Sequence, residues 1–203
     1  MQVLPIEFRA ADGRLLRGQI YGEGECWAVL VHEEGLDLDA WSDLPAQLHD
    51  LGFCVLAFDL RGHGASDDPW DAARLPEDVS AALQLARSQG ARKLYLVGAG
   101  VGADACLQAA VSEPVEALVA LSPLGRLDDG AVDSLRGVNV PRLILVGASD
   151  PAALATGERL YRASIGWCLL VGLPVDEQGS RMLAGDPGDP AREKVLGFLR
   201  DYL

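Results

Sequence analysis

The chain has 203 residues, of which 49% are hydrophobic, and it carries a formal net charge of −13 at pH 7. This length and hydrophobicity fit one globular domain over residues 1–203 and exclude a disordered chain. The negative charge speaks against nucleic acid or an anionic membrane as a partner, because both attract basic proteins.

Short apolar runs alternate with helical patterns along the chain. The first two runs, Val3–Phe8 and Leu15–Tyr21, flank Asp12-Gly13, a dipeptide typical of hairpin turns. Further strands are predicted at Trp27–Val31, Phe53–Phe58, Lys93–Val97, Ala117–Leu121, Arg142–Val146 and Trp167–Val171. Helices are predicted from Trp41 to Leu51, from Val79 toward Gly90, over 101–112, from Pro151 and from Pro190. This order predicts an α/β fold: a mostly parallel, twisted sheet of about eight strands with an N-terminal antiparallel hairpin and helices on both faces.

The cysteines and the N-terminus bear on cellular location. The four cysteines are Cys26, Cys54, Cys106 and Cys168, and they lack the sequence spacing of metal ligands. We expect reduced, mostly buried thiols. The N-terminus lacks the basic and apolar regions of a signal peptide, and no apolar run is long enough to cross a membrane. These features predict a cytoplasmic protein without a metal or cofactor.

The turn at residues 98–103 follows a predicted strand and precedes a helix, so it lies at the edge of the sheet where α/β proteins bind ligands. Gly98, Gly100 and Ala103 match the dinucleotide pattern G-x-G-x-x-G/A. The acid that would bind a ribose is missing where the next strand ends, at Leu121-Ser122. The same turn fits a nucleophile elbow, G-x-S-x-G, with Gly100 in place of the serine.

Several segments favour the elbow. Asp59-Leu60-Arg61-Gly62-His63-Gly64-Ala65-Ser66 resembles the D-x-R-G-x-G-x-S segment of the α/β-hydrolase superfamily. Residues 31–35 resemble its oxyanion loop, residues 145–151 the loop of its triad acid, and residues 178–183 the segment of its base histidine. The resemblance covers nearly the whole chain and implies an α/β-hydrolase fold. Residues 122–141 then form a short connection in place of a lid domain.

Residue by residue, the resemblance places Gly100 at the nucleophile, Asp150 at the acid and Gln178 at the base, or Glu177 if the alignment slips by one. Glycine has no side chain to attack a substrate, and an amide does not titrate near neutral pH. All three histidines precede the elbow. The N-myc downstream-regulated proteins, which are regarded as non-enzymatic, also carry a glycine-rich elbow. We expect Gly100 at positive φ, with open space above it facing Asp150 and Gln178.

The resemblance assigns the oxyanion hole to the backbone N–H groups of Glu34 and Val101. Glu33 replaces a glycine of the family, and two carboxylates beside the hole should disfavour an oxyanion. His32, Glu33, Ser122 and Glu177 are candidate binding residues. The ordinary alternative for His32 is support of the oxyanion loop, and for Ser122 it is a hydroxyl that caps the loop at Pro123.

These residues predict a non-catalytic protein that binds a small molecule or a protein partner through the former active-site pocket. The alternative is a weak, esterase-like hydrolase that uses Asp150 with Gln178 or Glu177 and water. A homodimer through a sheet edge or through residues 122–141 is a third option. Acidic residues crowd the predicted rim, at Glu33, Glu34, Asp37, Asp39, Asp150, Asp176 and Glu177. They indicate either the solvated loops of an acidic protein or a pocket for an amine or a metal cation.

Overall fold

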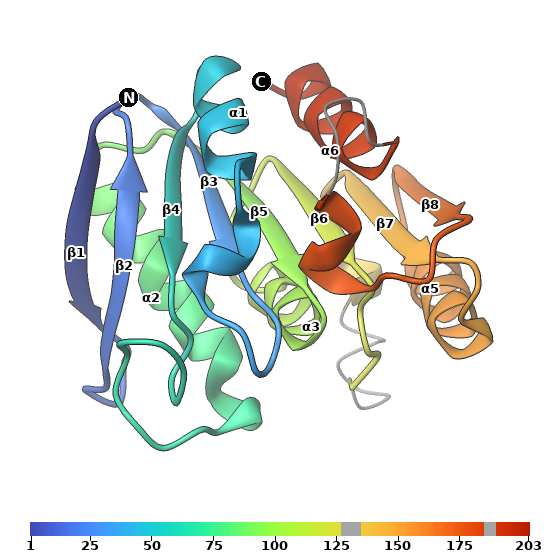
Figure 1. The fold of residues 1–203 in the computed structure, drawn as a ribbon, viewed down its shortest axis with the longest axis horizontal. Coiled ribbons are helices and arrows are strands. Elements are labelled where there is room, and N and C mark those ends of the chain that lie inside the picture. Colours follow the sequence, from blue (N-terminus) through green and yellow to red (C-terminus); the bar gives the residue numbers. More distant parts are fainter. Residues whose placement is uncertain (127–134, 185–189) are drawn as a thin grey trace.

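The computed structural model describes residues 1–126, 135–184 and 190–203, and its centre is an eight-stranded sheet (Figure 1). The strands are β1 (Val3–Arg9), β2 (Leu15–Tyr21), β3 (Cys26–Val31), β4 (Cys54–Phe58), β5 (Lys93–Ala99), β6 (Ala117–Leu121), β7 (Arg142–Gly147) and β8 (Cys168–Leu173). Their order in the sheet is β1-β2-β4-β3-β5-β6-β7-β8. The pairs β1–β2 and β2–β4 are antiparallel, and all other pairs are parallel. The predicted fold class is confirmed, including the opening hairpin.

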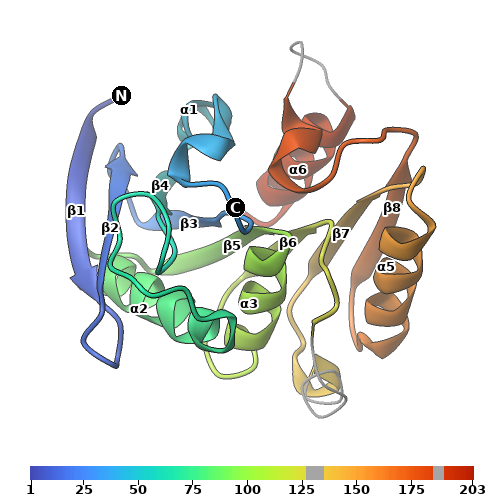
Figure 2. The same ribbon diagram turned by 60° about the horizontal axis from the view of Figure 1, so that its bottom comes forward.

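Helices cover both faces of the sheet and enclose two cores. They are α1 (Leu44–Asp50), α2 (Leu75–Ser88), α3 (Val101–Ala109), α5 (Pro151–Ala163) and α6 (Pro190–Asp201). Within β4, Val55 and Ala57 pack with residues of α1 and α6, whereas Leu56 and Phe58 pack with α2 and α3. Because side chains alternate along a strand, a continuous apolar run can fill two cores at once. Figure 2 shows α2, α3 and α5 on one face and α1 and α6 on the other.

One predicted helix differs in detail, and one predicted connection lies partly outside the described residues. The helix predicted from Trp41 to Leu51 is divided into a short 3₁₀ helix, Leu38–Trp41, and α1. Pro45 lies in the first turn of α1, where its missing N–H costs no helical hydrogen bond, so the sequence favours a new helix start there. Residues 127–134 of the connection predicted over 122–141 lie outside the described residues. Its described part includes a 3₁₀ helix at Leu135–Gly137, and none of the described helices is long and apolar enough to cross a membrane.

A buried ion pair anchors the loop after β4. Arg61 and Asp78 are 1% and 0% exposed, and Arg61 Nη2 lies 2.5 Å from Asp78 Oδ1. Arg61 also donates from Nη1 to Asp12 in the hairpin turn, at 2.9 Å. Nearby, Asp59 accepts hydrogen bonds from the backbone of Leu38 and Ala65. These contacts hold the segment that resembles D-x-R-G-x-G-x-S beside the oxyanion loop.

Candidate functional site

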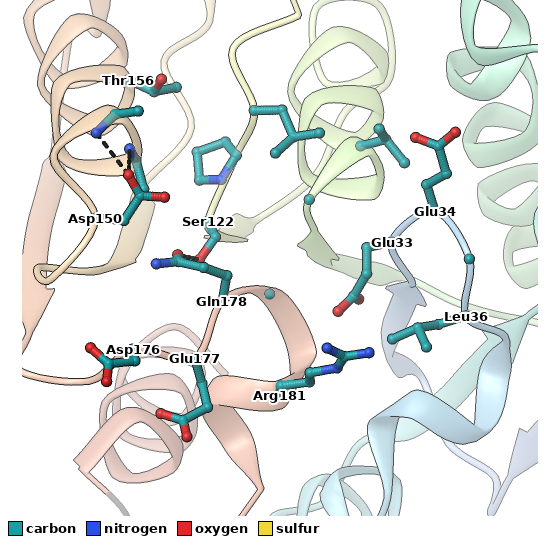
Figure 3. A pocket seen from close by; sticks show the side chains of 18 residues that line it. Glu33, Glu34, Leu36, Ser122, Asp150, Thr156, Asp176, Glu177, Gln178 and Arg181 are labelled. Carbon is teal, nitrogen blue, oxygen red and sulfur yellow. Dashed lines mark hydrogen bonds between the residues drawn. The ribbon is translucent and has the colours of Figure 1, made fainter.

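A cavity of about 850 Å³ opens at the carboxyl ends of the parallel strands (Figure 3). The loops after β3, β5, β6, β7 and β8 all contribute to its wall. The residues assigned to the triad and the oxyanion hole line it together, and they are Gly100, Asp150, Gln178, Glu34 and Val101. Of the candidate binding residues, Glu33, Ser122 and Glu177 also line it, whereas the described lining residues do not include His32.

The turn between β5 and α3 has the backbone of an elbow. Gly100 is the N-cap of α3 and adopts φ +53° and ψ −120°, a conformation that residues with side chains rarely adopt. A Cβ atom at Gly98 would lie 2.6 Å from the Cα of Ala103, and one at Gly102 would collide with the carbonyl of Val31. The neighbouring glycines are therefore required by the close packing of strand, turn and helix. The elbow interpretation accounts for all three.

The space above Gly100 is not open, so that expectation is wrong. A Cβ atom at Gly100 would lie 2.8 Å from the Cβ of Glu33, well inside the usual contact distance of two carbon atoms. The Glu33 side chain extends from there toward Gly179, where an added Cβ would lie 2.6 Å from Glu33 Oε1. The Cβ of Glu33 thus crowds the point where the side chain of a nucleophile would begin.

Hydrogen bonds hold the Glu33 carboxylate in this position. Its Oε1 accepts from the backbone N–H of Ser180 at 3.1 Å and from the Ser180 hydroxyl at 2.9 Å. Its Oε2 is buried and has no hydrogen-bond partner among the described residues. The sequence gives no signal for the role of Ser180, because the contact joins residues 147 positions apart.

Asp150 and Gln178 face the same cavity but make separate contacts (Figure 3). The Asp150 carboxylate accepts from the backbone N–H groups of Ala152 at 2.8 Å and Ala153 at 3.2 Å, and so it caps α5. Gln178 Oε1 accepts from the Ser122 hydroxyl at 2.5 Å and from the backbone N–H of Gly147 at 3.4 Å. Within the described parts of the chain, no hydrogen bond joins the acid position to the base position.

Ser122 differs from its expected structural role. Its hydroxyl donates to the side chain of Gln178 instead of capping the loop at Pro123. Its backbone has φ +45°, a positive value that is uncommon for a residue other than glycine. Because the amide oxygen of Gln178 cannot take up a proton near neutral pH, this contact positions the hydroxyl without activating it.

The two backbone amides assigned to the oxyanion hole make no hydrogen bond within the described residues. They belong to Glu34 and Val101. The Glu34 side chain points along the rim, where its Oε2 lies 3.3 Å from Arg126 Nη1. A second buried carboxylate, Asp104 in the first turn of α3, accepts from the backbone of Gly125 and Arg126 and holds that rim loop. Burial raises the pKa of Asp104.

Two histidines support the loop after β3 from behind. His32 Nε2 accepts from the backbone N–H of Leu60 at 2.9 Å, so the proton lies on Nδ1, which donates to the carbonyl of Glu33 at 2.8 Å. His63 Nε2 accepts from the backbone N–H of Gly35 at 2.9 Å. Burial lowers the pKa of His32, which keeps this imidazole uncharged. His32 is fully buried, so its position favours the supporting role over direct contact with a ligand.

The side chains at the cavity wall limit its chemistry. Among the described residues that line the cavity, the ionisable side chains are five carboxylates and one guanidinium. They belong to Glu33, Glu34, Asp150, Asp176, Glu177 and Arg181. No group of three His, Cys, Asp or Glu side chains in the described residues is placed to hold a metal ion. The site can hydrogen-bond a ligand and attract a positive charge, and among the described lining residues no hydroxyl is paired with an imidazole.

Comparisons with known proteins agree with this geometry. The sequence model of the α/β hydrolase fold matches residues 29–142, more than half of the chain. The chain belongs to the α/β hydrolase family. It is 27% identical over 192 residues, 92% of its length, to the "Putative carbamate hydrolase RutD" of Variovorax paradoxus (strain S110). It is 32% identical to an uncharacterized protein of Mycobacterium tuberculosis (strain CDC 1551 / Oshkosh), in an alignment of 182 positions that covers 75% of this chain.

The chain spans about two thirds of these relatives, 70% of the first and 64% of the second. Among solved structures, an esterase from Pyrococcus furiosus superposes with a TM-score of 0.79 at 16% identity. That superposition covers 99% of this chain and 91% of the esterase. At this identity the likeness shows the fold alone.

Proposed function

We propose that this member of the α/β hydrolase family is a binding protein without hydrolase activity, and that its cavity takes a small, positively charged molecule. The observation that carries this proposal is the pair Glu33 and Gly100. The elbow has no side chain at its centre, and the Cβ of Glu33 lies within 2.8 Å of the point where one would begin. A substrate carbonyl has no nucleophile to meet there.

The other side chains of the cavity support the absence of catalysis. A serine-type mechanism needs a hydroxyl or thiol and an imidazole that takes and returns its proton. Ser122 is the hydroxyl nearest to the base position, and it donates to the amide of Gln178. Asp150 accepts hydrogen bonds from the first turn of α5 and orients no base. Removing one triad member already forfeits most of the rate, and here two are replaced.

The charges around the cavity support a cationic ligand. Five carboxylates and one arginine line the wall, beside apolar groups such as Leu36, Val101 and Leu124. The N-terminus of α3 by itself would favour an anion. The Glu33 carboxylate on the same cavity wall opposes an anion and favours an organic ammonium group. A primary amine with an apolar body would match both the carboxylates and the apolar side chains of the cavity wall.

Weak hydrolysis of ester-type bonds is the second candidate. The amides of Glu34 and Val101 are free within the described residues, so they remain available to an oxyanion. One relative is named a "Putative carbamate hydrolase". In this case Asp150 would position a water molecule together with Gln178 or Glu177.

A matched set of ligands tests the binding proposal. 2-Phenylethylamine, 2-phenylethanol and phenylacetate share one apolar body and differ in charge. Calorimetry and thermal shift should rank the amine first and the acid last. Glu33→Gln should weaken amine binding about tenfold, because a charge-assisted contact is lost, whereas Glu25→Gln, on an exposed ion pair with Arg92, should not. Equal binding of the amine and the alcohol would contradict a cationic site.

A further inference from the structure

The outer strand β8 carries an apolar surface that the cavity does not explain. Four large hydrophobic side chains near this strand are 39–59% exposed, and they are Tyr161, Ile165, Trp167 and Leu169. They fall within nine residues of the chain. Of the other six exposed large hydrophobic residues of the described segments, Met1, Val3 and Leu4 lie at the opposite edge strand β1, and Val111, Leu124 and Leu203 lie apart from one another in the sequence. Large exposed apolar patches on proteins commonly mark contact sites.

These side chains flank the strand on both faces of the sheet. Trp167 stacks on Phe198 of α6 with ring centroids 5.5 Å apart, so it lies on the face that α1 and α6 cover. Cys168 and Leu170 pack on the opposite face, in the core that α5 helps to enclose. Leu169 alternates with them and therefore shares the face of Trp167. Tyr161 at the end of α5 and Ile165 after it lie on the other side.

The backbone of β8 has an open edge. In the pairing with β7, the carbonyls of Trp167 and Leu173 accept hydrogen bonds from Arg142 and Ala148, at 3.0 and 2.7 Å. In a parallel ladder, alternate residues direct both polar groups to one neighbour, so Cys168, Leu170 and Gly172 direct theirs outward. In Figures 1 and 2 no drawn strand lies beyond β8, the last strand of the sheet order.

The two edges of the sheet differ in their protection. Sheet edges are usually blunted by charges, proline or bulges, since a bare edge pairs with other strands. The outer strand β1 contains Pro5, Glu7 and Arg9. The segment from Gly166 to Leu173 contains no charged residue and no proline. It therefore has the features of a strand that pairs, not those of a protected edge.

The charge distribution identifies a second copy of this chain as the occupant. A two-fold contact places the same surface patch of both copies against each other, so a patch with a net charge repels its counterpart. In a chain of net charge −13, the segment Pro151–Leu173 contains one acid, Glu158, and two bases, Arg159 and Arg162. Glu158 and Arg162 already pair at 2.7 Å. Two copies therefore meet little charge repulsion across this face.

We propose that the protein forms a two-fold dimer in which β8 pairs antiparallel with β8 of a second copy. A two-fold axis at Leu170 places Cys168 opposite Gly172 of the second copy and joins the two sheets into one. The flanking apolar side chains are buried on both faces of the joined sheet. This proposal does not depend on what the cavity binds.

Light scattering after gel filtration tests the dimer. The wild-type protein should have about twice the 21.5 kDa mass of one chain at concentrations up to 200 µM. Leu169→Glu should raise the dissociation constant at least tenfold by placing two like charges in the contact. Leu4→Glu is the matched control, because Leu4 is similarly exposed, at 45%, on the opposite edge strand. Circular dichroism verifies that both variants are folded.

Cross-linking tests the register independently. Residues opposite each other in an antiparallel hydrogen-bonded pair lie about 5.5 Å apart at Cα, within the range of a disulfide. Gly172→Cys should therefore form an oxidised dimer through Cys168 of the second copy, and adding Cys168→Ser should abolish it. A wild-type monomer at 200 µM, equal effects of Leu169→Glu and Leu4→Glu, or no cross-link in a folded dimer would overturn the proposal.

Discussion

Placing a serine at the elbow tests whether Glu33 crowds the nucleophile position. Gly100→Ser should destabilise the protein through two separate effects. The backbone at φ +53° strains any residue with a side chain, at a cost of about 1–3 kcal/mol. The new Cβ would also lie 2.8 Å from the Cβ of Glu33, and overpacking of this kind costs about 1–3 kcal/mol more.

Two control variants separate these effects. Gly35 has φ +81° and nothing within 4 Å of an added Cβ, so Gly35→Ser measures backbone strain alone. Glu33→Ala keeps the Cβ that causes the collision, whereas Glu33→Gly removes it. Glu33→Gly should therefore recover about 1–3 kcal/mol in the Gly100→Ser background, and Glu33→Ala should recover almost none.

Urea unfolding of the single and double variants provides the free energies for this cycle. Each variant of Glu33 also removes the acceptor for Ser180, which is why both single variants are measured. Equal destabilisation by Gly100→Ser and Gly35→Ser would refute the reasoning. So would equal recovery by Glu33→Gly and Glu33→Ala.

Three further predictions concern the framework of the site. The free energy of unfolding should be fully retained above about pH 6.5, the ordinary pKa of histidine, and should fall as the pH decreases toward the lowered pKa of His32. His32→Gln should flatten this dependence in urea titrations between pH 7.5 and 5.5. Arg61→Ala should cost about 3–5 kcal/mol in urea unfolding by leaving Asp78 buried and unpaired, whereas Arg92→Ala on an exposed pair should change little. Iodoacetamide at pH 8 should label Cys54 and Cys106 more slowly than Cys26 in the folded protein, because Cys54 and Cys106 are buried. Burial also raises the pKa of Cys54 to about 12, which lowers the fraction of reactive thiolate. Mass spectrometry of peptides measures the labelling of each cysteine.

The fold follows from sequence because its central strands, β3 to β7, are buried on both sides. A run such as Cys54–Phe58 is completely buried, so its apolar character persists without alternation. The helix starts are equally local, as at Pro151, which follows the cap residue Asp150. The glycines of the elbow can also be predicted from the sequence, because each is required by backbone atoms that lie within a few residues or on the adjoining strand.

The contacts inside the site depend on packing between distant loops. Nothing near Glu33 in the sequence indicates that its side chain reaches Ser180 and covers Gly100. Asp150 has the residue type of a triad acid, but the same carboxylate also suits a helix cap, and the structure shows the cap. The contact between Ser122 and Gln178 spans 56 positions and requires the bend that Ser122 makes at positive φ. These side-chain contacts depend on tertiary packing between distant segments, which local sequence patterns do not predict.

Turnover of activated esters tests the central claim most directly. Wild-type protein and Asp150→Ala, purified in the same way, are compared with buffer on 4-nitrophenyl acetate and butyrate. Without a nucleophile at Gly100, both proteins should hydrolyse these esters no faster than buffer. Saturable wild-type turnover well above buffer, lost in Asp150→Ala, would contradict a non-catalytic site and identify the protein as a hydrolase.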